Sequence, residues 1–129
     1  MTVDCAAIPA AATVTATDNC DSAVPVSYLE TSNSVVDGCG QIIRNWTATD
    51  ACGNTATATQ TITVQDNTAP TLVGVPGDVT VDCGAIPAAA TVTATDNCDS
   101  AVPVSYLETS NSVVDGCGQI IRNWTATDA

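Results

Sequence analysis

The sequence predicts an all-β fold that consists of tandem antiparallel β-sandwich modules stapled by disulfide bonds. Side chains alternate with a period of two along several segments, and no stretch of ten or more residues shows helical periodicity. The chain also repeats itself, because residues 1–51 align with residues 79–129 without a gap and differ only at Met1/Val79 and Ala6/Gly84. The repeat period is therefore 78 residues, which is too long for most solenoid repeats and suits a small β-sandwich module.

Four segments of one period have the alternation of half-buried strands. They are residues 12–18 (ATVTATD), 24–30 (VPVSYLE), 42–50 (IIRNWTATD) and 55–64 (TATATQTITV). β-Branched residues are frequent in these segments, and stretches rich in Pro, Gly, Asn and Asp separate them. Arg44 is the one basic residue of its period, and we expect it to pair with Glu30 across the sheet.

The linker QDNTAP, residues 65–70, is the expected module boundary. It divides the chain into module 1, residues 1–65, which lacks its first strand, and module 2, residues 66–129, which lacks its last strand. Met1 occupies the position of Val79, and the first residues have neither the basic start nor the long apolar stretch of a signal peptide. We therefore expect the chain to be a piece of a longer array.

The charge of the chain restricts its partners. Fourteen acidic residues against Arg44 and Arg122 give a net charge of −12, and His and Lys are absent. Nucleic acids and anionic membranes need basic patches, so we expect neither as a partner. No apolar run reaches the roughly 18 residues of a membrane span, so we expect no membrane insertion. We also expect no enzymatic activity, because general acid–base catalysis usually needs His, Lys or a tuned carboxylate.

Cysteine is abundant in this chain. Seven cysteines among 129 residues suit an oxidising, extracellular setting. The alternative is a metal cluster in a reducing compartment, but zinc is disfavoured because the sequence contains neither a CxxC motif nor histidine. We therefore expect structural disulfides and an extracellular, cell-surface location.

The phrases DNTAPTLVGVPGDVTV, TVTATDNC and WTATDACGNTATATQTITVQD resemble the hyalin repeat (HYR) family in its bacterial, HYR-like form. Together they cover nearly the whole period. The resemblance implies an immunoglobulin-like β-sandwich within a large surface protein that acts in cell adhesion, as in the adhesins of gliding bacteria. The partners would then be neighbouring repeat modules and a surface or glycan ligand.

The immunoglobulin-like topology that this resemblance implies also suggests how the cysteines pair, although four cysteines allow three connectivities in each module. In that topology the two TATD phrases of a module end at one pole, and the other two cysteines lie at the opposite pole. The expected bridges are Cys5–Cys39, Cys20–Cys52 and Cys83–Cys117, with Cys98 unpaired because its partner would follow Ala129.

Acidic and amide side chains gather at the pole of the TATD phrases, where the linker of an array should meet the next module. Ca²⁺ takes six to eight oxygen ligands, which Asp and Asn on short loops can supply. The expected ligands are Asp18, Asn19, Asp50, Asp66, Asn67, Asp96, Asn97 and Asp128. The alternative is that these side chains cap turns by bonding to their own backbone. No contiguous DxDxDG motif favours calcium over this alternative.

These observations predict a non-catalytic repeat module of a long extracellular adhesin or stalk, which acts by number and reach. One alternative is a glycan- or protein-binding module. Another is a self-assembling filament subunit, because a sandwich without its first strand and one without its last strand could complete each other by strand exchange between chains.

Overall fold

The structure is a computed structural model that describes residues 1–128. Its chain divides into two units, Met1–Asn67 and Thr68–Ala129. Every regular element of the described residues is a β-strand or a single 3₁₀ turn, and most strand pairs are antiparallel, so the predicted all-β fold is confirmed. Across residues 1–128, no helix has the length and apolar character that a membrane span requires.

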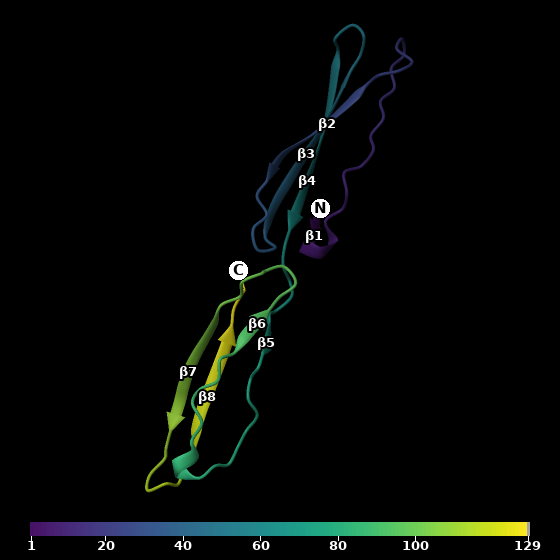
Figure 1. The fold of residues 1–129 in the computed structure, drawn as a ribbon. Helices are drawn as coiled ribbons and strands as arrows, with labels where there is room; N and C mark the ends of the chain where they lie inside the picture. The colour runs from purple at the N-terminus through teal and green to yellow at the C-terminus, as the bar shows by residue number, and fades with distance from the viewer. Residues whose placement is uncertain (129) are drawn as a thin grey trace. The chain divides into compact units, whose positions relative to one another are not determined.

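The first unit is built on a four-stranded sheet with the order β1-β4-β3-β2 (Figure 1). β1 is Thr2–Val3, β2 is Val26–Asn33, β3 is Gly40–Thr49 and β4 is Thr55–Val64. β3 pairs antiparallel with β2 and with β4, whereas β1 joins the outer edge of β4 in parallel orientation. The alternation seen in the sequence places every second side chain of β3 on the buried face.

A small apolar core lies at one end of this sheet. Ile62 and Val64 of β4 pack against Ile42 of β3, and Ile62, directly opposite Ile42, is 0% exposed. Val3 and Val35 cover the edge of this cluster. Full burial of a side chain of this size contributes about 1.5–3 kcal/mol. The C-terminal half of β4 therefore supplies much of the hydrophobic stabilisation of the first unit.

A tight turn joins β2 to β3. Asp37 and Gly38 have φ values of 46° and 78° and lie between the bridged residues Val36 and Cys39. Two successive residues with positive φ form the type I′ hairpin turn, for which Asp-Gly is a preferred sequence. This turn sets the register in which Ser32 stands opposite Ile43, and an irregularity between Glu30 and Ser32 then shifts the pairing by one residue, so that Glu30 stands opposite Arg44.

Residues 12–18 form no strand in the first unit, so the prediction of a strand there is wrong. They follow a 3₁₀ turn, η1, at Cys5–Ala7, and belong to an extended segment that runs alongside the sheet (Figure 1). In the second unit, the same sequence does form a strand, β6, Thr93–Thr95, which pairs antiparallel with β5, Thr71–Val73. The sequence of β5 has no counterpart in residues 1–67, so this segment has no strand to pair with.

The second unit contains, in addition, the 3₁₀ turn η2 at Cys83–Ala85 and the hairpin of β7, Val104–Asn111, and β8, Ile120–Ala126. The register of β7 with β8 repeats that of β2 with β3, including the irregularity after Glu108. β8 has 7 residues, whereas β3 has 10 although the sequences are the same. The difference follows from β4, which pairs with β3 and whose sequence occurs once in the chain.

Candidate functional site

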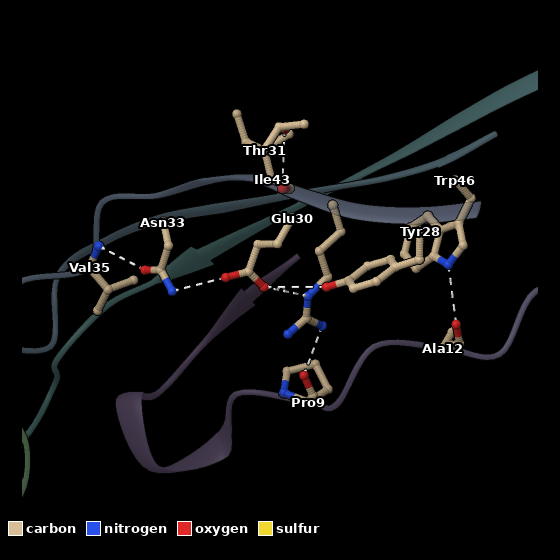
Figure 2. Close-up of polar contacts among 10 residues, drawn as sticks. Pro9, Ala12, Tyr28, Glu30, Thr31, Asn33, Val35, Ile43 and Trp46 are labelled. Carbon is tan, nitrogen blue, oxygen red and sulfur yellow. Dashed lines mark hydrogen bonds and ion pairs between the residues drawn. The ribbon is translucent and has the colours of Figure 1, made fainter.

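A polar network on the buried face of β3 holds the extended segment against the first unit's sheet. Arg44 pairs with Glu30 at 3.4 Å, as predicted, and its Nη1 donates a hydrogen bond to the carbonyl oxygen of Pro9 at 2.8 Å. Trp46 Nε1 donates to the carbonyl oxygen of Ala12 at 3.2 Å, as Figure 2 shows. The two side chains replace the missing strand pairing as the attachment of this segment.

The two TATD phrases of the first unit end in turns that contact each other. Asp21 Oδ2 accepts a hydrogen bond from the backbone N–H of Ala51 at 3.3 Å. This bond links the turn after Asp18 to the turn that connects β3 with β4. The expectation that both phrases end at one pole is therefore confirmed, and Asp21 is the residue that connects them.

Asp50 organises the turn between β3 and β4. Its Oδ1 accepts from the backbone N–H groups of Cys52 at 2.9 Å and Asn54 at 2.8 Å, and its Oδ2 accepts from the Asn54 side-chain amide at 2.7 Å. These hydrogen bonds, above all that from the Asn54 side chain, favour the carboxylate and hold the pKa of Asp50 below its ordinary value.

We expect acid to weaken this turn. Because the pKa of Asp50 is lowered in the folded chain, its contribution to stability is complete above the ordinary value of 3.8 and is lost as the pH falls through the lowered value. An NMR titration of the Asp50 carboxyl carbon should give a midpoint below 3.8. In Asp50→Asn, which keeps an acceptor oxygen but does not titrate, hydrogen exchange at Asn54 should lose this acid dependence. A midpoint at or above the ordinary value would contradict the prediction.

Asp18 and Asp96, which occupy equivalent positions in the two copies, cap turns of the same kind. Asp18 Oδ1 accepts from the backbone N–H groups two and three residues ahead at 2.8 and 3.1 Å, and Asp96 Oδ1 does so at 2.7 and 3.1 Å. Short side chains that bond to the following backbone in this way stabilise turns. A carboxylate has a second oxygen, so this role does not by itself prevent cation binding.

The other predicted ligands have varied surroundings. Asn19 and Asn97 are exposed, and the latter's amide lies 3.1 Å from the sulfur of Cys98. Asp66 is half-buried and Asn67 is exposed, and both follow the end of β4 that is opposite the Asp50 turn. Asp128 is half-buried and follows β8. Within the first unit, the structure therefore brings Asp18 and Asp50 to one pole and places Asp66 and Asn67 at the other.

Two aspartates outside the expected ligand set also form part of these turns. Asp21 bridges the two turns, and its counterpart Asp99 is 8% exposed and accepts from the N–H of Ala101 at 2.8 Å. The sequence signal for this role is the second aspartate of the phrase DNCD, because an aspartate in a turn often accepts hydrogen bonds from the backbone that follows it.

Residues 1–64 match the family described as HYR-like domain with 4 cysteines. The first unit is an HYR-like domain. Residues 79–129 repeat residues 1–51, which is most of the matched sequence. HYR-like domains are extracellular, and a match to them suggests an adhesion-type repeat module. Comparisons with curated proteins and with solved structures gave no significant match.

The cysteines of the chain are only partly paired as predicted. The Cys5–Cys39 bridge is wrong, because Cys5 is disulfide-bonded whereas Cys39 is a free thiol. The prediction of an unpaired Cys98 is also wrong, since Cys98 is disulfide-bonded. The pairing was based on an immunoglobulin-like topology, and two cysteines at the same pole of such a fold form a bridge only if their sulfur atoms also meet in space.

The other two predicted bridges are open in the structure, where Cys20, Cys52, Cys83 and Cys117 are free thiols. Their surroundings nevertheless approach each other. The residues that follow Cys20 and precede Cys52 share the Asp21–Ala51 hydrogen bond, and Cys83 Sγ lies 3.6 Å from the position of a Cβ on Gly116. Both bridges therefore stay predictions for an oxidising compartment.

We expect Cys20 and Cys52 to form a disulfide when the chain is oxidised. A bridge that closes a loop of this length should stabilise the domain by about 3–4 kcal/mol. Peptide mapping after alkylation, without reduction, should recover the two cysteines in one linked peptide. Cys52→Ser is the control, because it should leave Cys20 open to alkylation. Full alkylation of both thiols in the oxidised chain would contradict the prediction.

The outward face of the first unit's sheet is a polar shelf. The amide of Asn45 donates to Thr31 Oγ1 at 2.9 Å and its oxygen accepts from Thr59 Oγ1 at 2.7 Å, so a row of hydrogen bonds crosses β2, β3 and β4. An open hollow of about 440 Å³ lies on this face. Its lining residues are Ser27, Leu29, Thr31, Asn45, Thr47, Thr57 and Thr59. Hydroxyl and amide groups around an exposed leucine suit a neutral polar ligand.

Proposed function

We propose that this chain is a non-catalytic repeat module of a long extracellular adhesin or stalk at the cell surface, which acts by number and reach. The observation that carries the proposal is the near-identity of residues 1–51 and 79–129 within an HYR-like match. Identical copies in one chain multiply a weak contact or lengthen a spacer, whereas a single catalytic site gains little from repetition. The lack of His and Lys in the sequence supports a non-catalytic role.

Cells that display increasing numbers of tandem copies of this chain test the proposal. Adhesion to other cells or to a solid surface should rise steeply with copy number at equal display, because linked weak contacts gain avidity. The thickness of the surface layer, measured by electron microscopy, should also increase with the number of copies. Adhesion that does not depend on copy number would overturn this function.

A glycan-binding role is the second candidate, and the polar shelf on β2, β3 and β4 favours it. Neutral sugars offer hydroxyl groups to Thr and Asn side chains and an apolar face to Leu29, which is 63% exposed. A glycan array probed with the whole chain should show selective signals that Asn45→Ala removes. Absence of binding to every glycan on the array would exclude the glycan-binding role and would be consistent with a spacer.

Calcium binding at the TATD pole belongs to the same proposal. Asp18, Asn19 and Asp50 lie on the linked turns of the first unit, and Asp96, Asn97 and Asp128 repeat them in the second. One oxygen of Asp18 and of Asp96 already caps its turn, so a bound Ca²⁺ would use the remaining carboxylate, backbone and water oxygens. When bound, the cation would neutralise part of the chain's negative charge and stiffen the loops.

We expect Ca²⁺ at millimolar concentration to raise the melting temperature by a few degrees, since a ligand that binds only the folded state stabilises it. Asp18→Ala and Asp96→Ala, which are matched positions of the two copies, should each reduce this shift. Mg²⁺ at the same ionic strength is the control for charge screening. Equal melting temperatures in EDTA and in Ca²⁺ would rule out a stabilising calcium site.

A further inference from the structure

The outer edge of β2 in the first unit, and that of the equivalent strand β7 in the second, have no strand beside them. Among residues 1–128, β2 pairs with β3 alone and β7 pairs with β8 alone. The two units together describe every residue of the 78-residue period, and no segment of the period pairs with this edge in either unit. The open edge therefore belongs to the repeat itself and does not depend on where the sequence begins or ends.

The backbone groups on this edge follow from the hydrogen bonds on the other side of β2. Thr49 donates its backbone N–H to the carbonyl oxygen of Pro25 at 3.4 Å, which continues the register of β2 with β3. In an antiparallel pair, residues whose N–H and C=O groups face the partner alternate with residues whose groups face away. Val26, Tyr28 and Glu30 therefore direct their backbone groups away from β3. The irregularity after Glu30 ends this regular edge.

Large uncharged side chains are exposed along the same edge. Leu29 and its counterpart Leu107 are each 63% exposed, and Tyr28 is 44% exposed. Proteins commonly block strand addition by placing lysine or proline on an open edge, and residues 26–30 contain neither. Free backbone groups and exposed apolar area therefore occur together on one short segment, and they do so in both copies.

We propose that repeats of this chain bind one another edge to edge, with residues 26–30 of one copy antiparallel to residues 26–30 of a second copy. These residues are called the pairing edge, and residues 104–108 form the same edge in the second unit. Backbone hydrogen bonds supply the affinity, as in other strand additions. The proposal names a second copy of the chain as the partner of the adhesive array, and it therefore rests on the proposed function.

A two-fold axis at Tyr28 pairs the whole edge. Tyr28 then stands opposite its equivalent in the second copy, and Val26 stands opposite Glu30. All the backbone N–H and C=O groups that the pairing edge directs away from β3 find a partner in this register. The two tyrosine rings form an opposing aromatic pair, which stabilises a sheet. Each ring already packs beside Trp46 of its own chain, with centroids 5.5 Å apart (Figure 2).

On the other face of the sheet, the same register covers the exposed leucines. Leu29 stands opposite Ser27 of the second copy and diagonal to the second Leu29. Diagonal neighbours of an antiparallel pair are about 7–8 Å apart, within reach of long side chains. Leu29 also lines the polar shelf, so pairing makes the shelves of the two chains continuous.

The distribution of charge allows a second copy to be the occupant. The net charge of −12 opposes association, but residues 22–36 contain one acidic side chain, Glu30, and Arg44 pairs with it at 3.4 Å. Because Glu30 stands opposite Val26, the two Glu30 side chains lie about 14 Å apart along the strands, beyond the Debye length of about 8 Å at physiological ionic strength. An array repeats this edge in every copy, so a short and weak contact is multiplied by number.

Hydrogen exchange of the purified chain, followed by NMR at about 20 μM and about 1 mM, tests the proposal. At the higher concentration the backbone N–H groups of Val26, Tyr28 and Glu30 should exchange about threefold more slowly. Those of Ser27 and Leu29, which face β3, should not change. This alternation is specific to pairing at the edge. Equal exchange of all these groups at both concentrations would overturn the proposal.

A matched set of variants separates edge pairing from nonspecific association. Leu29→Asp combined with Leu107→Asp places a charge on both pairing edges and should abolish the dependence on concentration. Both side chains are 63% exposed, so this variant should fold. Thr55→Asp combined with Thr61→Asp adds the same charge at exposed positions of β4 and should preserve the dependence. Loss of the dependence in both variants, or in neither, would also contradict the proposal.

Displayed arrays that carry Leu29→Asp and Leu107→Asp in every copy show whether this contact is the adhesive one. Their adhesion to cells that display the same array should fall to the level of a single copy. Adhesion that still rises steeply with copy number would exclude a second copy as the partner, although the adhesive function would stand. The exchange experiment uses the free chain, so its outcome does not depend on that of the display experiment.

Discussion

Ile42→Ala is expected to lower the free energy of unfolding of the first unit by about 2–5 kcal/mol. The side chain is 3% exposed, and it packs against Ile62 and Val64 in the core cluster. Alanine would leave a cavity between two strands that the backbone hydrogen bonds of β3 and β4 hold in place. Native-state hydrogen exchange of the β3 amides measures this loss without unfolding the second unit.

Ile120→Ala is the matched control for this prediction. Ile120 has the same sequence neighbours as Ile42 and pairs with β7, the equivalent of β2, but no strand of the β4 type lies beside it among the described residues. It is half-buried, so its truncation should cost less than about 2 kcal/mol, because less apolar surface is lost. Equal losses of unfolding free energy at the two positions would show that packing against β4 does not account for the stabilisation by Ile42.

Gly40→Ala is expected to be the most damaging change in the hairpin of the first unit. A Cβ on Gly40 would lie 2.4 Å from the carbonyl oxygen of Ser34 and 2.7 Å from Val35 Cα, and both contacts are with backbone that cannot rotate away. The φ of +151° is also unfavourable for a residue with a side chain. We expect a loss of about 2–4 kcal/mol, or a shifted register of β2 against β3.

Two other glycines provide the comparison for Gly40→Ala. Gly118→Ala should have a similar effect on the second unit, since its Cβ would lie 2.3 Å from the carbonyl oxygen of Ser112. Gly77→Ala has open space around its Cβ and ordinary φ, so it should change stability by less than about 0.5 kcal/mol. Urea denaturation followed by circular dichroism can rank the three variants. A Gly40→Ala chain as stable as Gly77→Ala would contradict the prediction.

The sequence was a good guide wherever structure depends on local alternation. The long strands β3 and β4 were foreseen from their period of two, and the Arg44–Glu30 pair was foreseen because Arg44 is the one basic residue of its period. The segment 12–18 has equally clear alternation but forms no strand in the first unit. Alternation describes one strand, whereas a sheet needs a partner with matching hydrogen bonds, and that partner lies elsewhere in the sequence.

The candidate site was less accessible to sequence reasoning for the same reason. The meeting of the two TATD phrases was foreseen, because both follow segments of equal direction, but the part of Asp21 was not. Pairing of individual cysteines depends on sulfur positions within a few ångströms, which spacing along the chain does not determine. The use of Asp18, Asp50 and Asp96 as turn acceptors likewise follows from loop geometry and not from their number.

The identity of β3 and the β8 region has a consequence for the order of folding. A newly formed β4 has two acceptors of the same sequence, so the sequence of the acceptor cannot direct it to the right one. Distance along the chain does so, because only the short turn at Asp50 separates β4 from β3, whereas more than fifty residues separate it from β8. Closing a loop about ten times longer costs about 2 kcal/mol more in chain entropy. Correct assembly of near-identical repeats is thus achieved by chain proximity, and synthesis from the N-terminus strengthens it because β4 pairs before β8 exists.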